Sequence, residues 1–243
     1  MQHIKFCLRA PSMTCAARGQ ASCEVTRYIG ASGGGRGAHA APSHFGPMTG
    51  IRRFGPLDYE GMSAAQRDVA DEILAGPRGA NMKRVGGPFE PFLRSPGMAA
   101  VVQRVGAYVR FESSMPRHLN EMAVLLTARK WTAQFEWFAH HRLALEAGLD
   151  PAVADAISRG EVPEHLDPAA AAVHRFTSQL LDTGSVSDEA FEQLSQHFGE
   201  QQIVDLIGTV GYYCTISFIL NVDRCPTPDD TVPLAPLPNV RNA

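Results

Sequence analysis

The feature that most constrains this chain is a succession of helix start and stop signals between residues 63 and 222. Ser63 and Gln66 have the spacing of a capping box before AAQRDVADEILA, and Gly76 with Pro77 ends that segment. Further start signals of the same kind are Ser95-Pro96, Asp150-Pro151, Asp167-Pro168 and Ser187. No pair of segments has the chemistry of a strand hairpin, so the sequence predicts an all-α fold.

The segments between these signals have helical periodicity. The predicted helices are 64–75, 96–111, 117–131 after Pro116, one closed by Gly148, a short one from 151, 168–184, 188–198 and 201–222. In the second of these, one face carries Met98, Val101, Val102, Val105 and Val109. The last helix is apolar nearly all round, so we expect it to be central or to lie against another subunit of a homo-oligomer, as a dimer, trimer or hexamer.

Composition separates the start of the chain from the rest. With 44% hydrophobic and 19% charged residues the whole chain is ordinary for a globular protein, but residues 1–47 hold five Lys and Arg against one Glu, a charge of +4. The total of −3 therefore leaves −7 for residues 48–243, which argues against nucleic-acid binding. We predict one helical domain over 48–243, preceded by a disordered basic tail or by a mis-assigned start before Met48.

The cysteines and the apolar runs exclude several classes of protein. The five cysteines are Cys7, Cys15, Cys23, Cys214 and Cys225. No two form a C-x-x-C pair, so neither a disulfide scaffold nor a structural zinc site is indicated. The run 203–220 is interrupted by Asp205, glycines and hydroxyl residues, which disfavours a membrane span, and residues 1–47 lack the apolar region of a secretory signal. We therefore expect a cytoplasmic protein without a membrane partner.

One stretch, ARKWTAQFEWFAHH at 128–141, concentrates aromatic and ionisable residues. Glu136 and His140 are four apart and share a helix face, while Trp137 and His141 share the next one. Glu121 lies nineteen residues before His140, and a helical hairpin would bring its carboxylate back to the same face. The sequence thus predicts two carboxylates converging on one histidine.

Such a buried group can transfer protons, because desolvation and neighbouring charges perturb its pKa values. A simpler interpretation is that Glu136 and His140 form a helix-stabilising pair among core aromatic residues. A metal site is a weaker alternative, since the H-E-x-x-H order is absent. We expect no cofactor.

The run NEMAVLLTARKWTAQFEWFAHHRLALEAGL resembles the carboxymuconolactone decarboxylase family, whose active helices carry a glutamate, then E-W-x-x-H, then an A-x-x-A-G-L-like exit. Here these residues are Glu121, Glu136, Trp137 and His140. The flanking GPFEPFLRSPGMA and FEQLSQHFGEQQIVDLIGTVGYYCTISFILNVDRCP extend the likeness over roughly residues 85–235. The resemblance implies an all-helical, oligomeric bundle like that of alkylhydroperoxidase D, with the site near a subunit interface.

The same resemblance exposes a departure. Alkylhydroperoxidase D proteins use a C-x-x-C pair before the histidine, and by spacing those two positions are occupied here by Ala133 and Glu136. A peroxidatic cycle needs a thiolate and a resolving thiol, so the resemblance favours acid–base chemistry instead.

The expected activity is a cofactor-free decarboxylase or isomerase for a small carboxylated lactone or a related aromatic ring-cleavage product. His140 would donate or accept the proton, Glu136 would orient it and Glu121 would tune the pair. Trp137 and His141 would contact the substrate, with Arg94 or Arg129 as its cation, although an ordinary surface or ion-pair role is the alternative for both arginines. The other functions that remain open are hydroperoxide reduction and a non-catalytic helical oligomer.

Overall fold

The computed structural model describes residues 51–228 and 231–237, all within the unit His44–Ala243, and the predictions for residues 1–47 lie outside this part. The α-helices are α1 (Ala64–Ala75), α2 (Phe89–Phe92), α3 (Pro96–Ala107), α4 (Arg117–Lys130), α5 (Gln134–Glu146), α6 (Pro151–Arg159), α7 (Pro168–Thr183), α8 (Asp188–Ser195) and α9 (Glu200–Asp223). Two 3₁₀ turns, η1 (Tyr59–Gly61) and η2 (Gly79–Asn81), and a π-helical turn, η3 (Tyr108–Glu112), complete the elements. The residues described contain no strand, which confirms the predicted all-α class.

Local capping sets the helix boundaries. The Ser63 hydroxyl accepts from the Gln66 amide at 3.3 Å, while the Ser63 amide donates to Gln66 Oε1 at 2.8 Å, which is the reciprocal capping box predicted from the sequence. At the start of α7, the Asp167 side chain accepts from the Ala170 amide at 2.9 Å. That helix ends at Gly184, whose φ of +73° is a left-handed conformation that glycine adopts at little cost.

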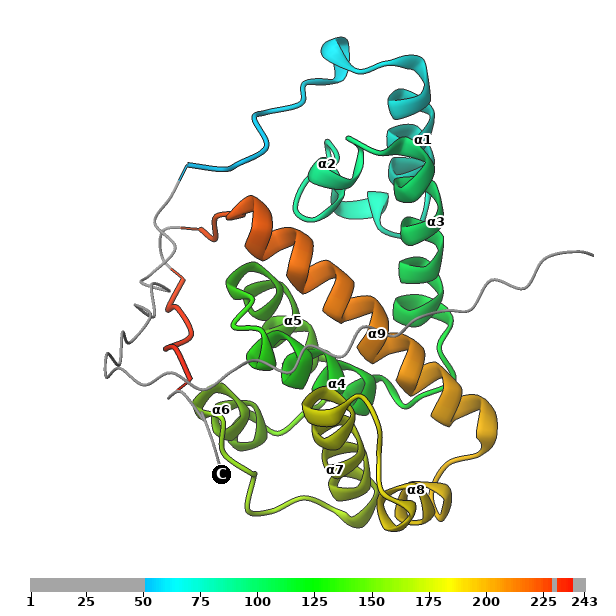
Figure 1. Ribbon diagram of the computed structural model, residues 1–243, viewed down its shortest axis with the longest axis vertical. Coiled ribbons are helices and arrows are strands. Elements are labelled where there is room, and N and C mark those ends of the chain that lie inside the picture. Colours follow the sequence, from blue (N-terminus) through cyan, green and yellow to red (C-terminus); the bar gives the residue numbers. More distant parts are fainter. Residues whose placement is uncertain (1–50, 229–230, 238–243) are drawn as a thin grey trace, which may run out of the picture. The chain divides into compact units, whose positions relative to one another are not determined.

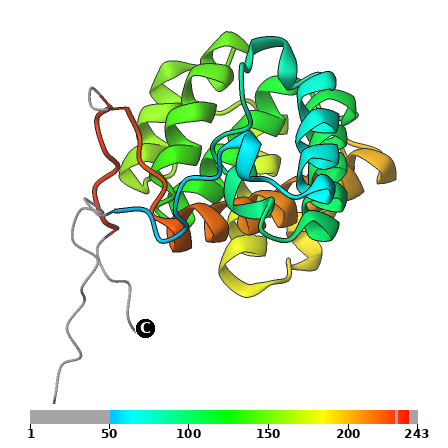
Figure 2. The same cartoon turned by 90° about the horizontal axis from the view of Figure 1, so that it is seen from above.

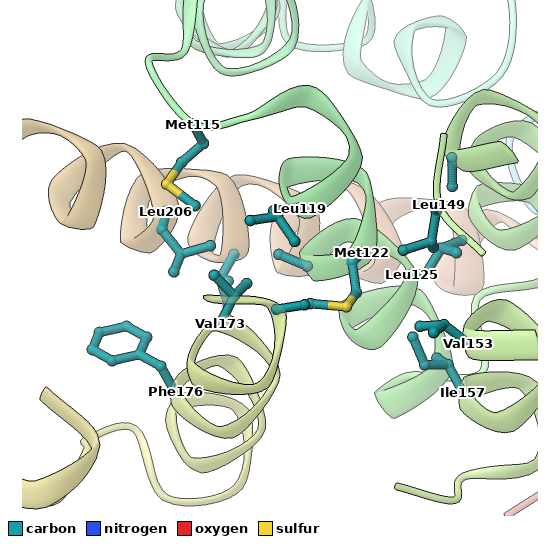
Figure 3. Close-up of a cluster of buried hydrophobic side chains, with 14 of the residues drawn as sticks. Met115, Leu119, Met122, Leu125, Leu149, Val153, Ile157, Val173, Phe176 and Leu206 are labelled. Atoms are coloured by element: carbon teal, nitrogen blue, oxygen red, sulfur yellow. The ribbon is translucent and has the colours of Figure 1, made fainter. Parts of the chain in front are cut away.

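Helix α4 lies at the centre of the fold and packs against α5, α6, α7 and α9. Its side chains at Met122, Ala123, Leu125 and Ala128 are fully buried. Figure 3 shows part of the cluster around it, in which the labelled side chains are Met115, Leu119, Met122, Leu125, Leu149, Val153, Ile157, Val173, Phe176 and Leu206. A helix enclosed on so many sides can hold ionisable side chains away from water.

Helix α9 is the long apolar helix, and it passes α3, α4 and α5 in the two views of Figures 1 and 2. Among the helices described, it alone is long and apolar enough to cross a membrane by length and composition. Here 56% of its most apolar window is buried inside the fold. This agrees with the prediction that the helix is central, since a core helix has the same composition as a membrane span.

The predicted apolar face of α3 is only partly the buried one. Val102 and Val109 are buried, but Met98, Val101 and Val105 are 44–53% exposed. The helix buries its smaller or polar side instead, and Gln103 on that side donates to Glu72 Oε1 of α1 at 2.7 Å. The sequence pattern was therefore wrong about which side of α3 faces the core, because a polar contact with α1 and close packing at small residues decide its orientation.

Candidate functional site

The α4–α5 hairpin builds the site. Helix α4 ends at Lys130 with Trp131 as its cap. Thr132 then turns the chain with a φ of +47°, and the Ala133 amide donates to the Ala128 carbonyl at 2.8 Å. This tight turn sends α5 back along α4. Glu121 on α4 and His140 on α5 consequently face each other, as the spacing of the two residues predicts.

His140 lies between two carboxylates. Its Nδ1 is 2.6 Å from Glu121 Oε2, and its Nε2 is 3.0 Å from Glu136 Oε1. We call these three residues the Glu–His–Glu triad. The exposed fractions of Glu121, Glu136 and His140 are 4%, 3% and 4%, so the three groups interact in an environment that screens charge poorly.

The two carboxylates fix the protonation of the imidazole. Burial alone would lower the pKa of His140, but the charges and hydrogen bonds of Glu136 and Glu121 outweigh it and raise that pKa from 6.5 to about 9. At neutral pH His140 is thus an imidazolium that donates its Nδ1–H to Glu121 and forms an ion pair with Glu136 through Nε2. The triad then carries two negative charges and one positive charge.

A buried tyrosine covers the imidazole. The Tyr213 ring of α9 meets the His140 ring edge-on, with centroids 4.8 Å apart. Burial, with the nearby charge of Glu136, raises the pKa of Tyr213 well above 10, so its phenol stays neutral. This ring helps to exclude water from the triad.

The predicted substrate-binding residues Trp137 and His141 lie beside the triad on the next face of α5. Their rings are stacked, with centroids 5.7 Å apart and an interplanar angle of 27°. Both line a surface depression of about 280 Å³, together with Phe138, Thr231 and Val232. The triad residues themselves do not line this depression.

The two arginines predicted to supply a cation to the substrate, Arg94 and Arg129, lie in different environments. Arg94 is exposed and donates to the Gly55 carbonyl, and within the described residues it forms no hydrogen bond or ion pair with the triad. Arg129 is only 4% exposed, and its Nη2 donates to the Ala235 carbonyl at 2.7 Å. Its Nε and Nη1 are buried and have no hydrogen-bond partner among residues 51–228 and 231–237, and burial lowers the pKa of Arg129. Arg129 follows Glu121 by eight residues, which is about 12 Å along the helix axis.

Residues 231–237, which we call the C-terminal strap, were not predicted as part of the site. Gln134 at the start of α5 forms two hydrogen bonds with Leu234, from Nε2 to the carbonyl (2.9 Å) and from the Leu234 amide to Oε1 (2.8 Å). Leu234 is 7% exposed and belongs to the central cluster. The segment TVPLAPLP has no helical or strand period, so its leucines between prolines are the single sequence signal for this contact.

The cysteines that the structure describes are poorly suited to redox chemistry. Burial raises the pKa of both thiols, to about 11 for Cys225, and Cys214 Sγ accepts the Trp131 indole N–H at 3.2 Å. Ala133, which occupies the first position of the alkylhydroperoxidase D C-x-x-C pattern, is fully buried. Over residues 51–228 and 231–237 no group of three or more His, Cys, Asp and Glu is arranged to hold a metal ion.

Comparison with known proteins identifies the fold. No family model and no curated protein matches the sequence. A crystal structure of an alkylhydroperoxidase AhpD core, an uncharacterized peroxidase-related protein from Ralstonia eutropha JMP134, aligns with a TM-score of 0.62 and 16% identity, over 74% of this chain and 94% of that one. The chain therefore has an alkylhydroperoxidase D-like fold. A protein of unknown function from Agrobacterium tumefaciens aligns with a TM-score of 0.47 and 22% identity over 56% and 94% of the two chains, which is too low to add to the argument.

Proposed function

We propose that this protein is a cofactor-free acid–base enzyme, a decarboxylase or isomerase, that acts on a small carboxylated lactone or a related ring-cleavage product. The observation that carries the proposal is the buried His140 with a carboxylate on each ring nitrogen. Burying three ionisable groups opposes folding unless their mutual attraction compensates for lost hydration. Clusters of this kind with a strongly perturbed pKa are characteristic of sites that transfer protons.

The geometry changes the role first assigned to His140. Both of its ring nitrogens are bound to glutamates, so neither is free to reach a substrate atom. The proton must instead be exchanged through a carboxylate. Glu136 is the better candidate, because it stands at the position of the second thiol in the C-x-x-C pattern and its neighbour Trp137 lines the depression.

A proton-transfer cycle follows from this arrangement. The Glu136 carboxylate accepts a proton from a carbon next to the substrate carbonyl. The imidazolium of His140 stabilises the negative charge that this transfer leaves on the substrate. Returning the proton to another carbon gives isomerisation. For decarboxylation, His140 passes its Nε2 proton to Glu136, which protonates the dienolate left after loss of carbon dioxide, and solvent then restores the imidazolium.

Arg129 supports an anionic substrate. Two carboxylates and one imidazolium leave the triad with a net charge of −1, which repels an anion unless a cation lies nearby. Arg129 is a buried guanidinium whose Nε and Nη1 have no hydrogen-bond partner in the described structure, so it retains N–H groups that can donate to a substrate carboxylate. It lies on the same helix as Glu121, about two turns further along.

A second candidate, a non-catalytic helical protein, is favoured by one observation. The triad does not line the depression beside Trp137, and its three residues are at most 4% exposed. In that case the triad would serve only to join α4 and α5. Catalysis requires a movement that opens a path from the surface to the triad.

The test is turnover by wild type and four variants on a panel of small lactone carboxylates. Carbon dioxide release and solvent deuterium incorporation report decarboxylation and proton exchange. We expect His140→Ala and Glu136→Gln to lose about 10²–10⁴-fold in rate, which is the usual contribution of general acid–base catalysis. Cys214→Ser and Cys225→Ser should retain nearly full activity, and circular dichroism should verify that each variant is folded.

The outcomes separate the candidates. A thiol mechanism would reverse the ranking, with activity lost in a cysteine variant and kept in His140→Ala. The non-catalytic candidate would show no exchange by the wild type on any compound, while His140→Ala would still lower the thermal midpoint.

A further inference from the structure

Two arginines, Arg78 and Arg110, lie over one aromatic ring. The guanidinium carbon of Arg78 is 5.7 Å from the centroid of the Phe111 ring, and that of Arg110 is 5.1 Å from the same centroid. Within residues 51–228 and 231–237 neither guanidinium forms an ion pair with a carboxylate, although residues 48–243 carry a net charge of −7. An aromatic ring attracts a cation but does not neutralise it. The two positive charges therefore lie close together without a counter-charge.

A tight turn after α1 holds Arg78 in this position. The Gly79 amide donates to the Gly76 carbonyl at 3.0 Å. A Cβ atom added at Gly79 would lie 1.7 Å from the Leu74 carbonyl oxygen, so only glycine allows the chain to fold back this closely onto α1. From this turn the Arg78 guanidinium also reaches the Phe89 ring of α2, with 4.9 Å to the centroid.

The backbone of α3 leaves room for the same guanidinium. A Cβ atom added at Gly106 would lie 2.0 Å from the Tyr212 hydroxyl and 2.4 Å from Arg78 Nη2. Nη2 donates to the Tyr212 hydroxyl at 3.5 Å, which is long for a hydrogen bond. The Nε atom of Arg78 is buried and has no hydrogen-bond partner in the part of the chain that the structure describes. Arg78 therefore retains N–H groups that can donate to a ligand.

Arg110 and Phe111 belong to η3, the π-helical turn that directly follows α3. Turns of this kind are rare and occur frequently at functional sites. The Phe111 ring is 44% exposed and Tyr212 only 7%, so the cluster has one open end and one buried end. Burial raises the pKa of Tyr212 to about 12, although the charges of Arg78 and Arg110 lower it. Tyr212 is thus a neutral phenol, which supplies no negative charge to the arginines.

We propose that Arg78 and Arg110 bind the phosphate group of a small phosphate monoester beside Phe111. A phosphate monoester carries a charge of about −2 near neutral pH and three acceptor oxygens, which matches two guanidinium groups. A carboxylate carries a single charge and would leave one of the two cations uncompensated. The site contains no residue of the triad, so it would bind phosphate whether or not the triad transfers protons.

The test is binding of inorganic phosphate to the full chain, followed by the phosphorus-31 line width at constant ionic strength. The wild type should show saturable binding. Arg78→Gln and Arg110→Gln should each weaken it about 10–100-fold, since each removes hydrogen bonds from a charged donor to a charged acceptor. The matched control is Arg159→Gln on α6, which removes the same charge from an exposed pair with Glu161 and should retain the wild-type affinity.

A second titration addresses the class of anion. Acetate at the same ionic strength should bind at least about 10-fold more weakly than phosphate, because it offers one charge to two cations. Circular dichroism should verify the fold of each variant. Arg110→Gln provides the decisive measurement if Arg78→Gln does not fold, since Arg110 is half-buried at the open end of the cluster.

The results that would overturn the proposal are specific. A wild type without saturable phosphate binding, or an Arg110→Gln variant that binds as tightly as the wild type, would show that the two arginines are not a phosphate site. Acetate that binds as tightly as phosphate would overturn the assignment to a phosphate monoester.

Discussion

Raising the pH should remove the stabilisation that His140 provides. Its pKa is raised from 6.5 to about 9 in the folded protein, so the folded state holds the imidazole proton more tightly than the unfolded chain does. For a group shifted in this direction, the stabilisation is complete below pH 6.5 and is lost as the pH rises through about 9. Stability should therefore fall between pH 6.5 and pH 10.

The structure gives the size of the effect. The folded and unfolded pKa values differ by about 2.5, and each factor of ten in proton affinity corresponds to about 1.4 kcal/mol, so the loss is on the order of 3 kcal/mol. Solvent screening does not reduce this figure much, because His140 and both of its carboxylate partners are at most 4% exposed. A loss of this size is a substantial part of the stability of a typical domain.

The assay is urea unfolding of the wild type and of His140→Gln at pH 6 and pH 10. The glutamine variant has no imidazole to titrate. Between pH 6 and pH 10 its free energy of unfolding should therefore fall by about 3 kcal/mol less than that of the wild type. His174→Gln is the matched control: burial lowers the pKa of His174, and a histidine shifted in that direction affects stability on the acid side instead. If the free energy of unfolding of His140→Gln depended on pH as strongly as that of the wild type, the assignment of an imidazolium to His140 in the triad would be refuted.

Two further predictions concern the ends of the fold. Arg52→Ala should lower the free energy of unfolding in urea by about 3–5 kcal/mol, because it leaves the fully buried Asp223 without its cation. The control Arg142→Ala breaks an exposed pair within α5 and should lower it by less than about 1 kcal/mol. Equal losses in the two variants would contradict the argument. Deleting residues 1–47 should leave the thermal midpoint within a few degrees, since this segment lacks apolar periodicity, and insoluble protein would show instead that it is structural.

Local chemistry explains which parts of the fold could be predicted. The capping box at Ser63 and the Asp-Pro starts of α6 and α7 depend on neighbouring residues alone, so the helix boundaries follow from short stretches of sequence. The orientation of α3 depends on its contacts with α1 and α9, which no local pattern contains. The same holds for the strap, because Leu234 is bound by a side chain one hundred residues earlier.

The candidate site also has one part that the sequence predicts and one part that it does not. Glu136 and His140 are related by one helical turn, and Glu121 by a tight hairpin, so their approach could be derived from spacing. The residue that supplies a cation to the substrate could not be derived in this way, because the partners of an arginine depend on the whole fold. Arg94 and Arg129 look alike in the sequence. Arg94 is exposed and bound to a backbone carbonyl, whereas Arg129 is buried and has two nitrogens without a partner in the part of the chain that the structure describes.

The carboxylate at position 136 also changes what the histidine can do. With a neutral thiol at that position, His140 would have one carboxylate partner, Glu121, and its pKa would be raised less. With Glu136 present, a second negative charge contacts the ring and holds the proton up to about pH 9. A histidine in this state is not available as a base at neutral pH, so a mechanism in which it activates a thiol is disfavoured, whereas one in which it passes its proton to Glu136 or stabilises negative charge in the site is favoured. The Glu136 carboxylate, which stands where the resemblance places the second thiol, therefore supports the proposed proton transfer.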